Sequence, residues 1–369
     1  MTIQKNFKLS MAAIAASLLV AACGGGGGGD NASSGAAPAS GASTPTGSQT
    51  TSGVAPRTSV ATPNYAAGSF QLAAFEEINA YRNAMGVGML SQDSILDTSA
   101  QAHSLYLFSN LSTGVITALS HNEIAGNVNY YGDTPLSRAQ KAGAPTAEFV
   151  GEIAAAGVAT PISSAAAADC VGQALASVYH LANLTYNQET VGLGYTPGTT
   201  AYPIYACSID FGQMTGVVGT PSANAISSFG GQQIAPITVV HSPYTNESGV
   251  ALAMRAEAPN PAPDVSTPGR PILVRVNAVQ GVDTLSVSQY TLTDNSGTVV
   301  ASRILIPSAA TAGSSTVVVA DPNNGLPSGT AVLLPLAPLK ANTTYQVNFA
   351  GARNGAAVSA SWSFTTAAN

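Results

Sequence analysis

The sequence predicts an α+β protein with two folded parts, a helix-and-sheet domain followed by an all-β sandwich. Apolar residues recur every three or four positions within residues 70–85, which is typical of a helix that buries one face. From residue 272 onward, apolar and polar residues alternate in short segments, as they do in the strands of a sandwich. About 300 residues follow an N-terminal low-complexity segment, more than one hydrophobic core usually serves, so we expect two domains.

Residues 1–22 predict an export signal. Lys5 and Lys8 precede the uncharged run LSMAAIAASLLVAAC, which is too short to remain in a bilayer as a spanning helix. The small residues before Cys23 resemble the end of a bacterial lipoprotein signal. That resemblance implies cleavage before Cys23 and lipidation of this cysteine, which would tether the chain to a lipid bilayer of the bacterial cell envelope. Because Gly24 follows the cysteine, the resemblance further implies the outer membrane or the cell surface.

Residues 23–65 are expected to form the lipidated cysteine and a flexible linker. This stretch consists mainly of glycine, serine, alanine, threonine and proline. It contains almost no large apolar residue, so it cannot bury enough surface to offset its conformational entropy. The linker would hold the folded parts away from the lipid surface.

The charge of the chain argues against a nucleic-acid partner. Only 8% of the residues are charged, and the formal net charge is -6 at pH 7. Loss of the two signal-peptide lysines would leave 10 basic against 18 acidic residues, a net charge of -8. No basic stripe is present to neutralise phosphates.

The three cysteines predict one disulfide. With Cys23 lipidated, Cys170 and Cys207 are left as a pair in an oxidising compartment, where disulfides persist. Two cysteines alone are too few for a structural zinc site. We therefore expect a Cys170–Cys207 bond.

Three helices and one hairpin are expected in the first domain. The helix that begins near Phe70 ends at Gly86, and further helical patterns cover residues 94–110 and 163–184. Residues 189–212 predict two strands on either side of the turn TPGTT. Helices around a small sheet give an α+β arrangement or a three-layer α/β/α sandwich.

The order of motifs in residues 66–214 resembles the CAP superfamily, which includes the cysteine-rich secretory, antigen 5 and pathogenesis-related 1 proteins. The motifs are INAYRNAMGVGML, LDTSAQAHS, LSHNEIAG, GDTPLSRAQKAGA, VGEIAAAG, SVYHLANL and VGLGY. The resemblance implies a CAP-type three-layer α/β/α sandwich with a surface cleft. It also implies that two histidines and two acidic residues meet in that cleft.

Four residues of this chain match that cleft set. His121 matches the first histidine, Glu152 the glutamate after glycine, Asp169 the second acid and His180 the second histidine. The sequence departs from the family pattern beside them, with Ile153 after the glutamate and with Tyr179 and Leu181 around the histidine. These departures imply a cleft that is altered or closed.

Two interpretations of the four residues remain open. Two imidazoles and two carboxylates can bind a divalent metal such as zinc, or they can act as a general acid and base pair. Alternatively, His121 and Glu152 form a hydrogen-bonded strut between sheet and helix, because a buried polar group must find a partner in any case.

Other candidates are weaker. His103 is expected to pack or hydrogen-bond at a helix surface, His241 to be solvated, and Arg138 to brace the segment after His121. Ser177 lies near His180, but no GxSxG motif or orienting acid accompanies it, so the sequence argues against a serine hydrolase.

Residues 215–271 are expected to be an extended interdomain segment, and residues 272–369 a β-sandwich. Tyr345, Val347 and Phe349 would share one face of a hairpin whose partner strand presents Trp362 and Phe364 across the turn RNG. The stretch PLKANTTYQVNFAGARNGAAVSASWSFTT resembles bacterial immunoglobulin-like domains of surface proteins. That resemblance implies an immunoglobulin-like sandwich that spaces or presents its neighbour.

Three functions fit the sequence. The leading hypothesis is an envelope-anchored, non-catalytic binding module for a small apolar, lipid-like ligand or an extracellular protein partner. A second is a metal-dependent hydrolase that uses His121, Glu152, Asp169 and His180. A third is a structural or adhesive surface protein. No cofactor is predicted with certainty, and zinc is the candidate metal.

Overall fold

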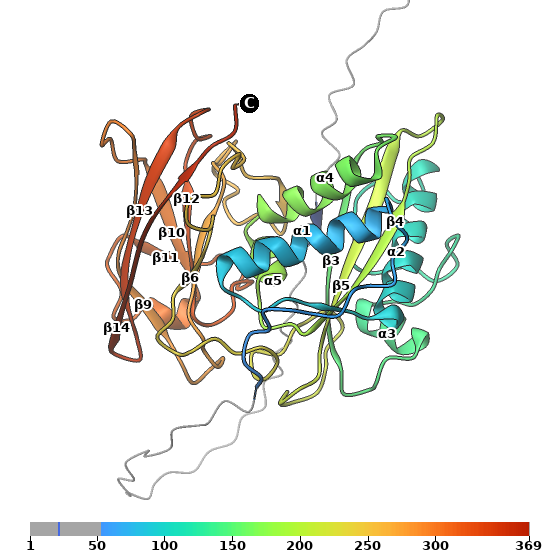
Figure 1. The fold of residues 1–369 in the computed structure, drawn as a ribbon, viewed down its shortest axis with the longest axis horizontal. Helices are drawn as coiled ribbons and strands as arrows, with labels where there is room; N and C mark the ends of the chain where they lie inside the picture. Colours follow the sequence, from blue (N-terminus) through green and yellow to red (C-terminus); the bar gives the residue numbers. More distant parts are fainter. Residues whose placement is uncertain (1–20, 23–52, 369) are drawn as a thin grey trace, which may run out of the picture.

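The structure is a computed structural model that describes residues 21–22 and 53–368. It confirms the predicted α+β class, since the five α-helices of the described chain all lie within residues 70–184 and strands of several β-sheets make up most of the regular structure after them. We refer to residues 70–213 as the α/β part and to residues 240–368 as the β part (Figure 1). No helix in the described ranges is long and apolar enough to cross a membrane.

The α/β part contains a four-stranded sheet with the strand order β2-β4-β5-β3. Its strands are β2 (Ser91–Gln92), β3 (Phe149–Val158), β4 (Thr190–Thr196) and β5 (Ile204–Gln213). β4 and β5 form the predicted antiparallel hairpin. β3 pairs with the other edge of β5 over its whole length, also antiparallel, and places Glu152 opposite Asp210.

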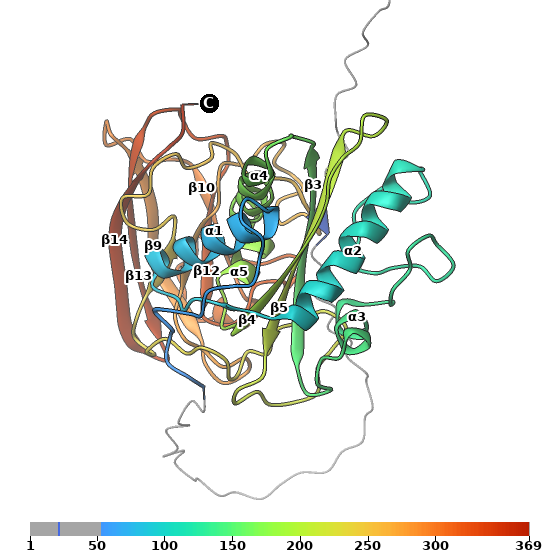
Figure 2. The same ribbon diagram turned by 45° about the vertical axis from the view of Figure 1, so that its right-hand side comes forward.

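Helices cover both faces of this sheet. α1 (Phe70–Met85) and α4 (Ser163–Leu175) lie on one face, and α2 (Ser94–Ser112) and α3 (Pro135–Ala142) lie on the other (Figures 1 and 2). The side chains of β3 and β5 therefore alternate between two environments. Ile153, Cys207 and Ile209 join the core under α1 and α4, whereas Ala154 and Ala206 join the core under α2.

The caps of α1 and α2 explain their boundaries. Ser69 accepts a hydrogen bond from the backbone N–H of Leu72, and Gly86 ends α1 with φ of 87°, a left-handed conformation that suits glycine. Asp93 accepts from the backbone N–H groups of Ile95 and Leu96 at the start of α2. The predicted apolar face of α1 is buried as expected.

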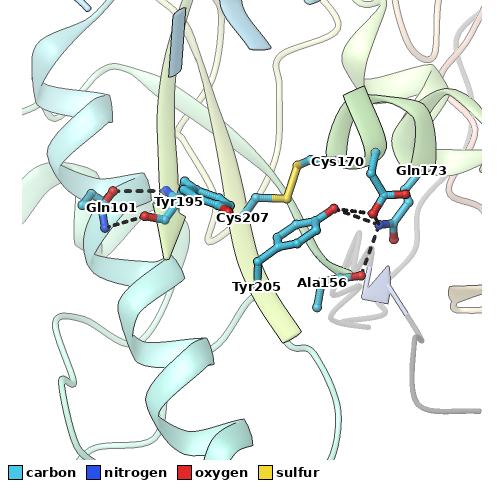
Figure 3. Close-up of a disulfide and its surroundings, with 8 residues drawn as sticks. Gln101, Ala156, Cys170, Gln173, Tyr195, Tyr205 and Cys207 are labelled. Carbon is cyan, nitrogen blue, oxygen red and sulfur yellow. Dashed lines mark hydrogen bonds between the residues drawn. A yellow bond between two sulfur atoms is a disulfide. The ribbon is translucent and has the colours of Figure 1, made fainter. Parts of the chain in front are cut away.

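Glycines on β4 let α2 approach the sheet closely. A methyl group on Gly192 or Gly194 would overlap the α2 backbone at Leu96 or Ala100. At this distance, α2 side chains bond the open edge of β4. Asp97 accepts from the N–H of Leu193, and the Gln101 amide bonds both the N–H and the carbonyl of Tyr195 (Figure 3).

The predicted helix over residues 163–184 is wrong in one respect, because it is broken in two. α4 ends at Leu175, and three residues separate it from α5 (Tyr179–Leu184). The carboxylate of Glu257, in β7 (Glu257–Ala258), accepts hydrogen bonds from the backbone N–H groups of Val178 and Tyr179 at 2.6 and 3.1 Å. A residue about 80 positions away thus starts α5, which the local sequence pattern could not indicate.

Two sheets pack face to face in the β part. One has the order β11-β10-β12-β8-β6 and the other the order β14-β13-β9. Their strands are β6 (Val240–Ser242), β8 (Ile272–Arg275), β9 (Leu285–Asp294), β10 (Ser302–Ile306), β11 (Val318–Ala320), β12 (Thr330–Pro335), β13 (Thr344–Arg353) and β14 (Ala356–Thr365). A short 3-10 helix, η1 (Ser308–Ala310), follows β10.

The C-terminal hairpin forms as the sequence indicates. Tyr345 pairs with Phe364 and Val347 with Trp362, so both apolar faces point into the core between the two sheets. Asn354 and Gly355 have φ of 48° and 82°, the left-handed pair that a tight hairpin turn requires. Trp362 is buried, as predicted.

Residues 215–271 join the two parts rather than separating them. β6 adds a strand to the first sheet of the β part, beside β8. One hydrophobic cluster includes Tyr179 and Leu181 of α5 together with Leu273, Leu326 and Val332 of the β part. Arg275 of β8 also donates to the Asn187 side chain and the Thr185 carbonyl at 2.8 and 2.9 Å. The two parts therefore share a core.

His241 differs from the expectation of a solvated side chain. Its ring stacks on Trp362 with the ring centroids 3.9 Å apart, and its Nδ1 lies 2.9 Å from the Pro243 carbonyl oxygen. Burial lowers the pKa of His241. The strand β6 carries this residue against the sandwich, and the sequence alone gave no sign of that strand.

β1 (Ala21–Ala22) pairs in parallel with β7. These two residues fall inside the predicted signal peptide, so the pairing belongs to the uncleaved chain if cleavage occurs before Cys23.

Candidate functional site

A buried polar cluster lies between the sheet and the helices α2 and α3. Glu152 of β3 and Asp210 of β5 are cross-strand partners, and their side chains point to the α2 and α3 face. His103 from α2, Arg138 from α3, and His121 and Glu123 from the intervening loop complete it. All six side chains are buried. We call these six residues the buried polar cluster.

Glu152 is the centre of the cluster. Its Oε1 lies 2.8 Å from His121 Nδ1 and 3.5 Å from His103 Nε2. Its Oε2 accepts from Arg138 Nη2 at 2.6 Å and from the Ser208 hydroxyl at 3.1 Å. Both carboxylate oxygens are therefore fully engaged with the protein.

His103 and Glu123 form a second pair in the cluster. His103 Nδ1 lies 3.0 Å from Glu123 Oε1, and Nε2 lies 3.0 Å from the Ser120 carbonyl oxygen. Glu123 Oε2 accepts from the backbone N–H of Tyr131 at 2.6 Å. His103 thus lies in the protein interior rather than at a helix surface, and it fixes the loop that carries His121.

Arg138 braces the same loop, as the sequence indicates. A capping box between Thr134 and Ser137 starts α3 one turn before Arg138. The guanidinium donates to the Gly132 carbonyl and pairs with Glu152. Its Nε also lies 3.7 Å from Glu123 Oε1, so one cation faces both carboxylates.

The pKa values of the two facing carboxyl groups, those of Glu152 and Asp210, are shifted in opposite directions. Burial alone would raise the pKa of Glu152, but the charges of Arg138 and His103 and the hydrogen bond from His121 lower it well below its usual range. Burial, followed by the negative charge of Glu152, raises the pKa of Asp210 far above its usual range. These surroundings therefore favour the ionised form of Glu152 and the protonated form of Asp210. Burial is also the main reason that the pKa of His121 is lowered.

His180 lies on α5 and contacts an acid outside the predicted set of four residues. Its Nδ1 is 3.3 Å from Glu257 Oε2, and both side chains are buried. The positive charge of His180 is one of the smaller causes that lower the pKa of His121, so the two rings are within electrostatic reach. His180 therefore lies near the cluster, but Glu257 holds it.

The expectation that Asp169 joins the other three residues is wrong. Asp169 is exposed on α4, where it accepts hydrogen bonds from Tyr205 at 2.6 Å and Gln173 at 3.0 Å. It lies beside Gly157, five residues along β3 from Glu152, which is roughly 17 Å at about 3.3 Å per residue. The neighbouring Cys170 takes the helix face that points to the sheet.

The Cys170–Cys207 disulfide is present, as predicted, and links α4 to β5 (Figure 3). The close-up also shows Gln173 reaching the Ala156 carbonyl and the Tyr205 hydroxyl beside the disulfide. Cys23, the predicted lipidation site, lies outside the described residues.

Zinc does not fit the predicted residues. His121 Nε2 and His180 Nε2 are buried without a hydrogen-bond partner in the described chain, so two imidazole nitrogens are available. A catalytic zinc takes three protein ligands and a structural zinc takes four. Glu152 is committed to Arg138, His121 and Ser208, and Asp169 is distant. Over residues 53–368, no group of three or more His, Cys, Asp or Glu side chains has the geometry to hold a metal ion.

Sequence reasoning missed three acids that matter here. Glu123 lies two residues after His121, and nothing in its local sequence marks it as the partner of His103. Asp210 interrupts the apolar run of SIDFG, and an isolated acid in a buried strand is a usable signal. Glu257 has no signal in the sequence, because only the fold brings it to α5.

Of the hollows on the surface, two concern ligand binding. The junction cleft, about 240 Å³, lies between α5, residues 224–226 and the loop 323–327 of the β part. The α2 groove, about 610 Å³, lies between residues 64–71 and the side of α2 that borders β4, and Tyr65, Leu105 and Leu193 contribute to its lining. Neither of these hollows is lined by a member of the buried polar cluster.

A search of protein-family models finds no match to this sequence, and a search of curated proteins finds no relative.

Proposed function

We propose that this chain is an exported, envelope-anchored protein whose residues 66–214 form a CAP-type domain that acts as a non-enzymatic binding module. The ordered motifs support the family, and so does a sheet that carries helices on both faces. The two facing sheets that follow support an immunoglobulin-like sandwich in residues 272–369.

The observation that carries the non-enzymatic function is the closure of the buried polar cluster. A general acid or base must come within hydrogen-bond reach of its substrate. His103, Glu152 and Arg138 are shielded from solvent, and their polar atoms are largely used by one another. Such a network rigidifies the fold around the loop 119–134. It supports the interpretation of His121 and Glu152 as a strut.

The α2 groove is the place we propose for a small apolar, lipid-like ligand. Its lining combines Tyr65 with the exposed side chain of Leu105, and most of its surface is carbon. An apolar chain bound there would remove this surface from water, which is the main driving force for binding such ligands. An extracellular protein partner would use the same exposed surface.

Thermal unfolding with and without palmitate tests this function. A ligand that binds the native state raises the unfolding temperature by mass action. We expect a rise in the wild type and in the control Val317→Asp, which changes an exposed valine of the β part. We expect none in Leu105→Asp, because the new charge would have to be buried against the acyl chain. If palmitate raised the unfolding temperature of all three proteins equally, or did not raise that of the wild type, the α2 groove would not be the binding site for an acyl chain.

The metal-dependent hydrolase has less support. The two unpartnered imidazole nitrogens, of His121 and His180, are the observation in its favour. Against it, Asp169 lies elsewhere and Glu152 is fully engaged.

We also propose that Cys23 tethers the protein to the envelope. The disulfide between Cys170 and Cys207 supports export, since such bonds persist in oxidising compartments. Replacing Cys23 by Ala should move the protein from the membrane fraction to the soluble fraction of cells, because one acylated cysteine is the predicted anchor. A variant that stays with the membrane would rule out this tether.

A further inference from the structure

We infer that the junction cleft binds a neutral saccharide, with amide side chains from both parts of the molecule as its hydrogen-bonding groups. Asn183 and Asn224 face it from the α/β side, and Gln280, Asn323 and Asn324 face it from the β part. This site is separate from the α2 groove, so it stands or falls independently of the lipid-like ligand.

The absence of charge defines the ligand class. Among the described residues that line the cleft there is no Lys, Arg, His, Asp or Glu. A phosphate or carboxylate would find no cation, and an amine would find no acid. An acyl chain would leave several amides without partners, which costs free energy when they are desolvated. Neutral hydroxyl groups, which both donate and accept, match amides that do the same.

The amides keep unused hydrogen-bonding atoms. The Asn224 Oδ1 accepts from the Glu152 N–H at 2.9 Å, which leaves its NH2 group for a ligand. The Asn323 Nδ2 donates to the Tyr179 hydroxyl and the Asn260 carbonyl, which leaves its oxygen. Gln280 and Asn324 are exposed at the rim. Donors and acceptors thus approach the cleft from both sides.

The wall formed by residues 323–325 is held rigidly before any ligand binds. The carboxylate of Asp321 accepts from the N–H groups of Asn323, Gly325 and Leu326. Tyr179 of α5 donates to the same carboxylate at 2.5 Å. Asn324 is held at φ of 51°, a left-handed conformation that asparagine tolerates. A preorganised wall loses little entropy on binding, which raises affinity.

Close contact between the two parts shapes the floor of the cleft. A methyl group on Gly325 would lie 2.8 Å from the Tyr179 ring, so glycine lets the loop 323–327 lie directly on α5. Tyr179, Leu326 and Pro327 provide carbon surface on which the C–H groups of a sugar can pack. At about 240 Å³ the cleft is smaller than a typical drug-sized site of roughly 300–1,000 Å³, so it suits one or two sugar units.

Isothermal titration calorimetry with cellobiose, maltose and N,N'-diacetylchitobiose tests the inference. We expect at least one of them to bind saturably to the wild type. The variant Asn324→Gly removes an amide without straining the left-handed backbone. It should weaken binding two- to tenfold, the effect of one lost neutral hydrogen bond. Adding Gln280→Ala should weaken it further.

The matched control is Asn342→Gly, another exposed left-handed asparagine that lies outside the cleft. It should bind like the wild type. No binding of any probe, or equal loss in the control, would overturn the inference. If glucose 6-phosphate bound as tightly as the neutral saccharides or more tightly, the conclusion that the uncharged cleft selects a neutral ligand would be wrong. Binding of an uncharged, end-blocked tripeptide that is lost in Asn324→Gly, with no saccharide binding, would assign the cleft to peptides instead.

Discussion

At the scale of single residues, Glu152 and Asp210 show how environment separates two identical groups. They lie opposite each other on β3 and β5, yet of these two carboxyl groups it is Glu152 that pairs with Arg138, His121 and His103. Like charges so close cannot both be stable in a buried site, so one carboxyl group stays protonated. In an open cleft, such a pair would suggest an acid and a base. Here burial makes it a structural pair.

The side chain of Glu148 should make the free energy of unfolding depend on pH. Burial, followed by the charges of Asp93 and Glu189, raises its pKa to about 7. The folded state therefore holds the proton more tightly than the unfolded chain, whose carboxyl titrates near 4.3. Stability should fall as pH rises from about 4.3 to 7. Glu148→Gln mimics the protonated acid and should remove this slope, so it should exceed the wild type in unfolding temperature at pH 8.

Unfolding temperatures of wild type and Glu148→Gln at pH 4.5, 6 and 8 check this. The difference between the two proteins must grow with pH. A constant difference would show that Glu148 titrates in the folded protein as it does in the unfolded chain.

At the scale of elements, the contact between α2 and β4 depends on two glycines. Gly192 and Gly194 point to α2, and they allow its backbone to lie against the strand. The short strand β2 pairs with β4 only at Thr190 and Val191, so Asp97 and Gln101 must bond the rest of that edge. The motif VGLGY is therefore a packing requirement of this helix and strand. It needs no direct role in binding.

Gly194→Ala tests this contact. The added methyl group would overlap the Ala100 carbonyl, so we expect a loss of about 1–3 kcal/mol in the free energy of unfolding, as for other overpacked cores. Gly172→Ala in α4 is the matched control. Its methyl group would meet no atom within 4 Å, and it should stabilise the helix by roughly 0.5–1 kcal/mol. Urea denaturation measures the free energy of unfolding of both variants. If Gly194→Ala were as stable as the wild type, α2 could move away from β4 without cost, and the contact would not depend on glycine.

At the scale of the whole molecule, contacts between the two parts lead us to expect that they unfold as one cooperative unit. Apolar residues of α5 share a cluster with β8 and β12, and Glu257 fixes the start of α5. Arg275 reaches from β8 to the turn after α5 and lies over the Tyr186 ring at 5.0 Å. A β-sandwich that only spaced its neighbour would not need these contacts.

Calorimetry should therefore show a single unfolding transition for both parts. Leu326 belongs to the shared cluster, so Leu326→Ala should lower the free energy of unfolding by about 2–5 kcal/mol, as is usual for a buried leucine. The unfolding temperature should fall, but a single transition should remain. The ratio of calorimetric to van't Hoff enthalpy should be close to one. Two separate transitions in the wild type would contradict the shared core.

The sequence by itself determined the elements that depend on local pattern. Helices α1 and α2, the β4–β5 hairpin and the strands after residue 272 follow from residue spacing and from caps such as Ser69 and Gly86. The disulfide followed from a simple count of cysteines. The helices, hairpin and strands are predictable because each depends on residues close together in the chain. The disulfide is predictable because only two cysteines remain to pair once Cys23 is assigned to the lipid.

Only the tertiary structure decided which distant residues meet. Glu257 breaks the third predicted helix, His241 stacks on Trp362, and Asp169 lies far from Glu152. Glu123 and Asp210, rather than Asp169, accompany Glu152 in the interior. Each outcome depends on a contact between residues far apart in the chain or on the direction of a side chain. Residue spacing does not encode such contacts, because they arise when separate elements pack together.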